Sequence, residues 1–236
     1  ELEYKYLITH FTISIFCFKI PIMKTVAFID ASNLFYGGKK SLGWSIDNEK
    51  LREYLKEKYE VSELYYFGGV EIHRFPFDYL RDDTVPIKEL EKYLLDLMKD
   101  KSESMSDAQI TLLDRHYRRV RFYLKLQKLG YKLMLKPVKT YETEEGNPVR
   151  KANCDVDMTL MMATKKDNFD RAIILSGDGD FLPVLKYLKE CDKEVLVLAR
   201  GPRTAKEIKR FAGSKFMDFE YLRERLKRTD EDGIDI

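Results

Sequence analysis

The stretch from Ala172 to Phe181 constrains the fold of this chain most strongly, because four apolar residues run directly into a small acidic turn. A continuous apolar run of this length, bounded by turn residues, predicts a strand that is buried on both faces. Gly177 and Gly179 suit a sharp reversal where larger side chains would clash, and apolar residues then resume with helical spacing. We therefore expect a strand–turn–helix unit with Asp178 and Asp180 in the turn.

Similar units recur along the chain and predict the fold class. Residues 25–29 form a second buried strand that ends on Asp30, and residues 194–199 form another near the C-terminus. Strands that alternate with helices indicate an α/β protein with a mainly parallel sheet covered on both faces. We predict a three-layer α/β/α, Rossmann-like sandwich over residues 23–228. Residues 72–104, rich in charges of alternating sign, are expected to be an insertion, and residues 229–236 an acidic tail.

Residues 1–22 are interpreted as an N-terminal extension, with natural translation starting at Met23 as the preferred hypothesis and a membrane anchor as the less favoured alternative. Their apolar part is interrupted by His10 and Lys19. It is shorter than the roughly 20 residues that cross a bilayer. It also lacks the basic start and small-residue cleavage site of a secretory leader. We expect no membrane partner.

Charge and cysteine usage exclude some functions. The 42 basic and 40 acidic residues leave a net charge of +2, so overall charge does not indicate a nucleic-acid binder, and any basic surface must be local. The three cysteines lack metal-type spacing and cannot all pair, which favours a reducing, cytoplasmic compartment. None of the three histidines is paired at ligand spacing, so a histidine zinc site is not expected.

Acidic residues from three separate segments are predicted to meet at one edge of the sheet. Right-handed crossovers place the C-terminal end of every strand on the same edge, which brings Asp30 near Asp178 and Asp180. Asp155 opens a helix that begins at this edge. Clustered carboxylates repel one another, so a cation is their natural partner, and oxygen-only ligands favour Mg²⁺ or Mn²⁺. A simpler interpretation of Asp178 or Asp180 is that one of them caps the helix.

Basic residues follow the strand at 194–199 and would lie beside the acids. We expect them to grip the substrate backbone, although a solvated helix face is an equally good interpretation of any single one. They are Arg200, Arg203, Lys206, Lys209 and Arg210.

Three motifs, in this order, closely resemble the NYN domain. They are FIDASN at 28–33, KANCDVD at 151–157 and SGDGDF at 176–181. The resemblance is to LabA-like members of the PIN-like nuclease superfamily and spans about residues 24–220. It implies a Rossmann-like fold, a divalent metal and cleavage of RNA. We further expect the RNA to be single-stranded and the protein to form a homodimer.

The resemblance also assigns roles to residues. It implies catalytic roles for Asp30, Asp155, Asp178 and Asp180, with the first three binding the metal. Asn33 would hold the loop or a phosphate, and Ser176 would support the acids. Many relatives carry a further Asp six residues after the position of Asp155, where this chain has Met161.

That departure puts catalysis in question, so the competing hypothesis is a non-catalytic or weakened RNA-binding or scaffold domain on the same fold. Two other classes fail on particular residues. A metal-dependent adhesion site would need Ser at Leu34, and a haloacid-dehalogenase phosphatase would need Asp at Ser32.

Overall fold

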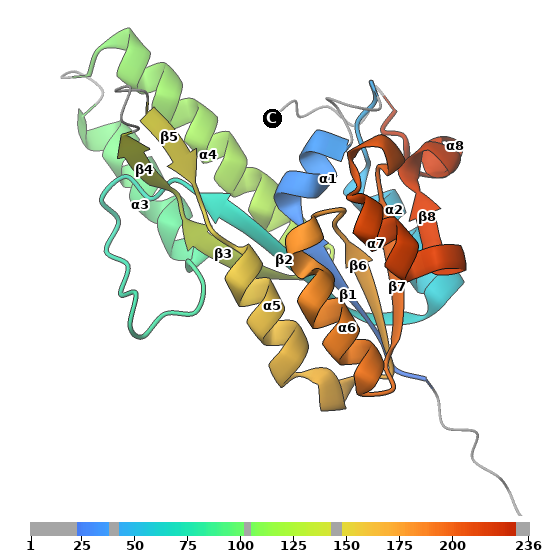
Figure 1. Ribbon diagram of the computed structural model, residues 1–236. Helices are drawn as coiled ribbons and strands as arrows, with labels where there is room; N and C mark the ends of the chain where they lie inside the picture. The colour runs from blue at the N-terminus through green and yellow to red at the C-terminus, as the bar shows by residue number, and fades with distance from the viewer. Residues whose placement is uncertain (1–22, 38–42, 102–104, 143–147, 230–236) are drawn as a thin grey trace, which may run out of the picture.

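The computed structural model describes residues 23–37, 43–101, 105–142 and 148–229 of the 236-residue chain. Helices and strands alternate along most of the chain (Figure 1). The elements are β1 (Thr25–Asp30), α1 (Ala31–Gly37), α2 (Asn48–Tyr59), β2 (Val61–Val70), α3 (Ile87–Lys101), α4 (Asp107–Lys128), β3 (Tyr131–Pro137), β4 (Lys139–Glu142), β5 (Pro148–Lys151), α5 (Asp155–Thr164), β6 (Arg171–Leu175), α6 (Leu182–Glu190), β7 (Glu194–Ala199), α7 (Lys206–Ala212), β8 (Phe216–Asp218) and α8 (Arg223–Leu226).

A six-stranded sheet runs through the middle of the molecule in the order β3-β2-β1-β6-β7-β8, and each adjacent pair is parallel. The chain builds the sheet outward from β1 to β3, returns to the centre at β6, and then builds outward the other way to β8. The order therefore reverses between β1 and β6. Ligands of open parallel sheets bind at such a reversal, outside the carboxyl ends of the strands.

Helices cover both faces of the sheet, which confirms the predicted three-layer α/β/α architecture (Figure 1). Alternate residues of β1 point to opposite faces. Val26 and Phe28 pack in the core with α5, α6 and α7, whereas Ala27 and Ile29 pack in the core with α2, α3, α4 and α8. All six residues of β1 are buried, as expected of a strand enclosed between two helical layers.

The segment 72–104 contributes to one of these layers. Helix α3 buries Leu90 and Leu94 completely, in the same core cluster as Leu51 of α2. The loop before α3 differs, because Tyr79 and Leu80 are exposed. The segment expected as an insertion thus combines a helix that packs in the core with a loop that presents apolar side chains to solvent.

Two further local features complete the fold. Ser106 and Gln109 form a capping box at the start of α4. The polar segment after β3 is an antiparallel hairpin of β4 and β5, whose turn at residues 143–147 lies outside the described residues. The interpretations of residues 1–22 and 230–236 also fall outside them. Within the described ranges, no helix is both long and apolar enough to cross a membrane.

A pair of leucines in segment 72–104 tests how far it belongs to the core. Leu90→Ala is expected to lower the free energy of unfolding by about 2–5 kcal/mol, because it empties a fully buried site. Leu80→Ala, at a side chain that is 97% exposed, should change it by less than about 0.5 kcal/mol. Urea denaturation of both variants measures this. Equal, small effects would show that α3 adds little to the stability of the domain.

Candidate active site at the carboxyl edge of the sheet

Asp30, the last residue of β1, is fixed by hydrogen bonds to both of its carboxylate oxygens. Its Oδ1 accepts hydrogen bonds from the Ser32 backbone N–H at 2.9 Å, the Ser32 hydroxyl at 2.7 Å and the Asn33 backbone N–H at 3.3 Å. Its Oδ2 accepts a hydrogen bond from the Ser176 hydroxyl at 3.1 Å. Only 7% of Asp30 is exposed. A buried carboxylate with this many donors is held in one orientation.

The turn after β6 brings Ser176 and Asp178 to the same edge. Ser176 is buried, and its hydroxyl both donates to Asp30 and accepts a hydrogen bond from the Asp178 backbone N–H at 3.3 Å. Asp178 in turn accepts a hydrogen bond from the Asp180 backbone N–H at 3.0 Å and so caps a short 3-10 turn. The capping role considered for either acid therefore belongs to Asp178. Both Asp178 and Asp180 are exposed.

Gly177 is needed for close packing in this turn, whereas a side chain at Gly179 would mainly displace the end of the flexible Glu207 side chain. Neither glycine has a positive φ. A Cβ on Gly177 would stand 2.9 Å from the Thr204 Cα, and one on Gly179 would stand 2.6 Å from the Glu207 Oε1. The Ala205 backbone N–H also donates to the Gly177 carbonyl at 2.9 Å. The loops after β6 and β7 thus lie against each other, which places α7 beside the acidic turn.

Asp155 opens α5 at the same edge and is half-buried. Its pKa is raised, first by burial and then by the negative charges of Asp30, Asp178 and Asp180; Lys151 opposes the shift. The three acids from other segments therefore lie close enough to Asp155 for their charges to act on it. The predicted convergence of the acidic segments is present in the structure.

The side chains around Asp155 are otherwise occupied. Asp157 forms an ion pair with Lys136 of β3 at 3.1 Å. Met161 is partly buried and packs against the core. Burial and nearby carboxylates raise the pKa of the Cys154 thiol to about 12, so it is a neutral thiol and a poor nucleophile.

The chemistry of these donors suits a hard divalent cation. Carboxylate and hydroxyl oxygens are the ligands that Mg²⁺ and Mn²⁺ prefer. A bound cation would also reduce the electrostatic repulsion between Asp155 and its acidic neighbours. Within the described part of the chain, however, no group of three or more His, Cys, Asp or Glu side chains is arranged to hold a metal ion. The acids share an edge of the sheet without forming a closed coordination site.

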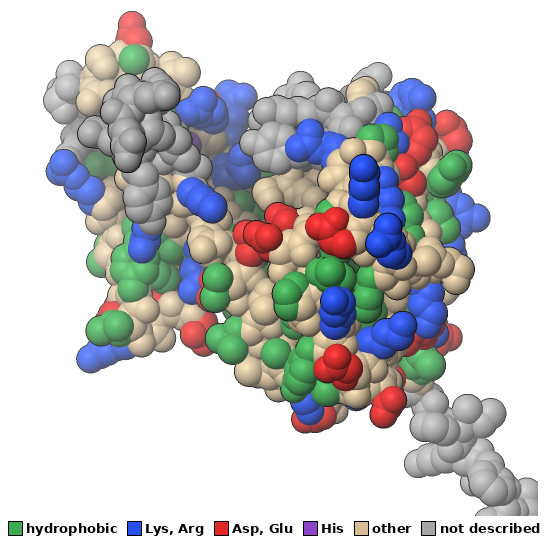
Figure 2. Space-filling model, viewed as in Figure 1, with side chains coloured by type: hydrophobic (Ala, Val, Ile, Leu, Met, Phe, Trp, Pro, Cys, Tyr) green, Lys and Arg blue, Asp and Glu red, His purple; other side chains and the backbone are tan. Residues whose placement is uncertain are grey.

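Basic side chains lie next to this edge. Figure 2 shows acidic side chains on the face above α5 and α6, with Lys and Arg side chains beside them over α7. Arg203, Lys206 and Arg210 are exposed, and Lys209 is half-buried. Arg200 differs, because its guanidinium is 3.2 Å from Asp218 and 3.0 Å from Glu220, and its side chain is only 16% exposed. The charge of Arg200 is thus largely compensated within the protein.

Several residues at or near this edge were not predicted from sequence. Lys151 ends β5 and acts on Asp155, and Glu207 of α7 lies next to Gly179. Elsewhere, His73 hydrogen-bonds His116 of α4, although the two are 43 residues apart and their spacing gives no sign of a pair. The Gly179–Glu207 and His73–His116 contacts join segments that are distant in sequence, so no local pattern could reveal them. Lys151 is only four residues from Asp155, within the same motif, and its spacing could have indicated the contact.

Comparisons with known proteins agree with the motifs. Residues 109–222 match the NYN domain family. Nearly half of the chain therefore resembles an NYN domain. It is also 22% identical over 207 residues to the Low amplitude and bright protein LabA of Synechococcus elongatus, covering 86% of this chain and 87% of that protein. The predicted resemblance to LabA-like NYN domains is thereby confirmed.

One solved structure shares the fold of this chain, and a second is a weaker match. A protein of unknown function from Vibrio parahaemolyticus matches with a TM-score of 0.52 and 18% identity, covering 83% of this chain and 93% of that one. The T5 D15 protein, crystallised with metal ions, matches with a TM-score of 0.41 and 14% identity, covering 79% of this chain and 59% of that one.

Ser176 tests the link between β1 and β6. Ser176→Ala should lower the free energy of unfolding by about 1–3 kcal/mol, because a buried carboxylate loses a donor and the Asp178 N–H loses an acceptor. Ser62→Ala is the control: it removes one hydrogen bond, to the Thr25 carbonyl, from an exposed side chain. Urea denaturation compares the two. Equal losses of unfolding free energy would mean that the hydrogen bonds of Ser176 stabilise the protein no more than those of a surface serine.

Proposed function

We propose that this protein is a divalent-metal-dependent endoribonuclease that hydrolyses phosphodiester bonds of single-stranded RNA at the acidic edge of the sheet. One observation carries the proposal: Asp30, Asp155 and Asp178 come from three separate segments and gather where the strand order reverses. The NYN assignment supports a nuclease or RNA-binding role. A cytoplasmic location and a homodimer remain predictions.

The residues divide into those that fix the site and those that meet the substrate. Asp30, held by its donors, is the rigid anchor, while Asp155 and the exposed Asp178 complete the set of acids. Mg²⁺ or Mn²⁺, when bound by these three acids, would stabilise charge on the phosphate and make a bound water more acidic. Asp180 is exposed beside them and could accept a proton from an attacking water.

Neighbouring groups would position the RNA. Asn33 lies in the first turn of α1 and directs its backbone N–H to Asp30, so its side chain is available at the edge to hold the loop or a phosphate. Arg203 and Lys206 would contact the backbone of the strand. Arg200, which is paired with Asp218 and Glu220, would support the loop after β7 and attract the RNA phosphates less strongly.

The alternative is a domain that binds RNA on the same surface without cutting it. Met161 favours this alternative, because it packs partly in the core where many relatives have an acid. A domain that has lost nuclease activity would keep the fold and the basic rim, which consists of Arg203, Lys206, Lys209 and Arg210, but would bind the cation weakly.

Substitutions at the acids separate the two functions. With Mn²⁺ and labelled single-stranded RNA, Asp178→Asn should cut at least ~100-fold more slowly than wild type. This loss corresponds to an increase of about 2.7 kcal/mol in the activation free energy. EDTA should abolish cutting by the wild type. The variant should fold, because Asn caps a helix about as well as Asp. Asp167→Asn, a surface carboxylate beyond the far end of α5, is the matched control and should retain full activity.

Met161→Asp completes the comparison. If wild type never cuts but Met161→Asp does, the domain is a lapsed nuclease that binds RNA. If neither protein cuts or binds RNA, the nuclease hypothesis falls.

The basic rim predicts a dependence on salt. Arg203→Ala/Lys206→Ala should bind single-stranded RNA more weakly, with a smaller salt slope, because each lost phosphate contact removes about 0.7 from the slope of log K against log salt. Arg200→Ala should leave the slope nearly unchanged and instead reduce stability, because Asp218 and Glu220 lose their partner. Fluorescence anisotropy over a range of salt concentrations measures both. An unchanged slope in the double variant would remove this surface from the site.

A further inference from the structure

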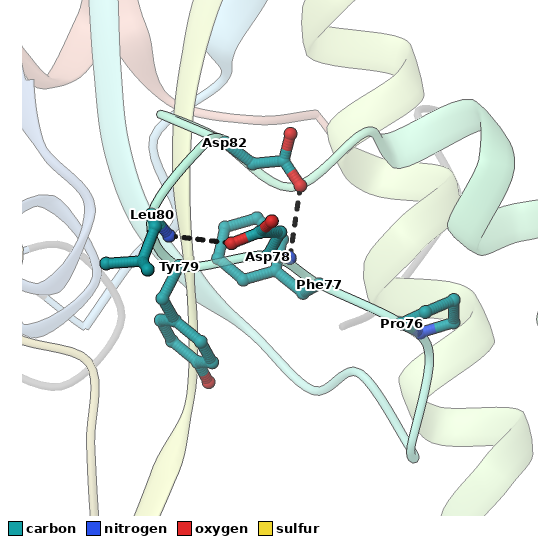
Figure 3. A pocket seen from close by; sticks show the side chains of 6 residues that line it. All are labelled: Pro76, Phe77, Asp78, Tyr79, Leu80 and Asp82. Atoms are coloured by element: carbon teal, nitrogen blue, oxygen red, sulfur yellow. Dashed lines mark hydrogen bonds between the residues drawn. The ribbon is translucent and has the colours of Figure 1, made fainter.

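The loop before α3 presents an aromatic and apolar surface that the acidic site does not use. Residues 76–82 line a shallow pocket of about 580 Å³, formed by Pro76, Phe77, Asp78, Tyr79, Leu80 and Asp82 (Figure 3). Tyr79 is 55% exposed and Leu80 is 97% exposed. Apolar side chains exposed side by side on a surface loop suggest a binding surface.

The acidic residues of this loop brace its backbone. The Asp78 carboxylate accepts a hydrogen bond from the Leu80 N–H at 2.9 Å, and the Asp82 carboxylate accepts one from the Asp78 N–H at 3.1 Å (Figure 3). Phe77 packs edge-on against Tyr79, with ring centroids 5.0 Å apart and an interplanar angle of 90°. The loop therefore holds Tyr79 in place by its own contacts, which reduces the entropy lost when a ligand binds to it.

A line of cations connects this loop to the acidic edge. The Lys139 ammonium, at the start of β4, lies 4.8 Å from the centroid of the Tyr79 ring. Lys139 pairs in register with Lys151 of β5, and Lys151 is the lysine whose charge acts on Asp155. Both lysines are exposed. Lys139 and Lys151 face each other at the base of the hairpin and thus link the Tyr79 ring to the acids.

Single-stranded nucleic acid matches this order of groups. Proteins that bind single strands stack bases on exposed aromatic rings and hold the phosphates with nearby cations. We propose that Tyr79, supported by Phe77 and Leu80, is a stacking site for one base of a single-stranded RNA whose backbone follows Lys139 and Lys151 toward the acidic edge. This site rests on the proposed function, since it extends the binding surface of the same substrate.

Binding without cleavage tests the site directly. Anisotropy with labelled oligouridine in EDTA compares wild type with Tyr79→Ala, Tyr79→Phe and Tyr221→Ala, and urea denaturation checks that all variants fold. Tyr79→Ala should weaken binding of a strand of roughly 20 nucleotides about tenfold, whereas Tyr79→Phe, which keeps the ring, should bind like wild type. Tyr221→Ala removes an even more exposed tyrosine near the C-terminus and should have no effect.

The length of the strand gives a second measurement. A strand of roughly 4 nucleotides, held at the acidic edge alone, should bind the wild type and Tyr79→Ala equally. Lys139→Gln should weaken binding of the long strand and lower its salt slope by about 0.7.

Three results would overturn the stacking site. Equal binding of the long strand by wild type and Tyr79→Ala would remove it while leaving the proposed nuclease intact. If Tyr79→Ala differs from wild type in its mass in sedimentation but not in its RNA affinity, the loop is a contact between copies of the chain instead. Absence of RNA binding by the wild type would overturn both this site and the proposed function.

Discussion

The hydrogen bond from Ser176 to Asp30 joins the two strands between which the strand order reverses. Strand β1 ends at Asp30 and β6 ends just before Ser176, and the two strands pair directly in parallel register. Ligands bind at the carboxyl ends of the strands on either side of such a reversal, because the connections from the two strands leave in opposite directions there. The acidic site follows from this one adjacency.

Electrostatic repulsion among the acidic residues also constrains this edge of the sheet. Burial and three neighbouring carboxylates raise the pKa of Asp155, with Lys151 opposing them. An arrangement of this kind does not help a protein to fold, since like charges brought together in a partly buried site destabilise it. It is therefore better explained by a ligand than by stability. The hairpin that carries Lys151 and Lys139 extends from this edge to Tyr79, so the cations that offset the acids also lead to the aromatic loop.

Local patterns predicted much of the fold. The apolar runs at 25–29 and 172–175 became β1 and β6 as predicted. Periodicity was less accurate about burial. In α4, Ile110 lies at core spacing with Leu113 but is 38% exposed, whereas His116, a polar residue, is buried and hydrogen-bonds His73 from a distant loop. A helix packed against both a sheet and another helix buries a wider face than a simple apolar stripe indicates.

The sequence by itself determined the kinds of element, the parallel sheet, and the presence of acids at the ends of β1 and β6 and at the start of α5, because each depends on residues close together in the chain. Only the tertiary structure decided which strands are neighbours, that Gly177 is required by Thr204 rather than by its own φ, and that Arg200 is paired with Asp218 and Glu220. These features depend on contacts between distant segments, and such contacts form only when the two helical layers close over the sheet.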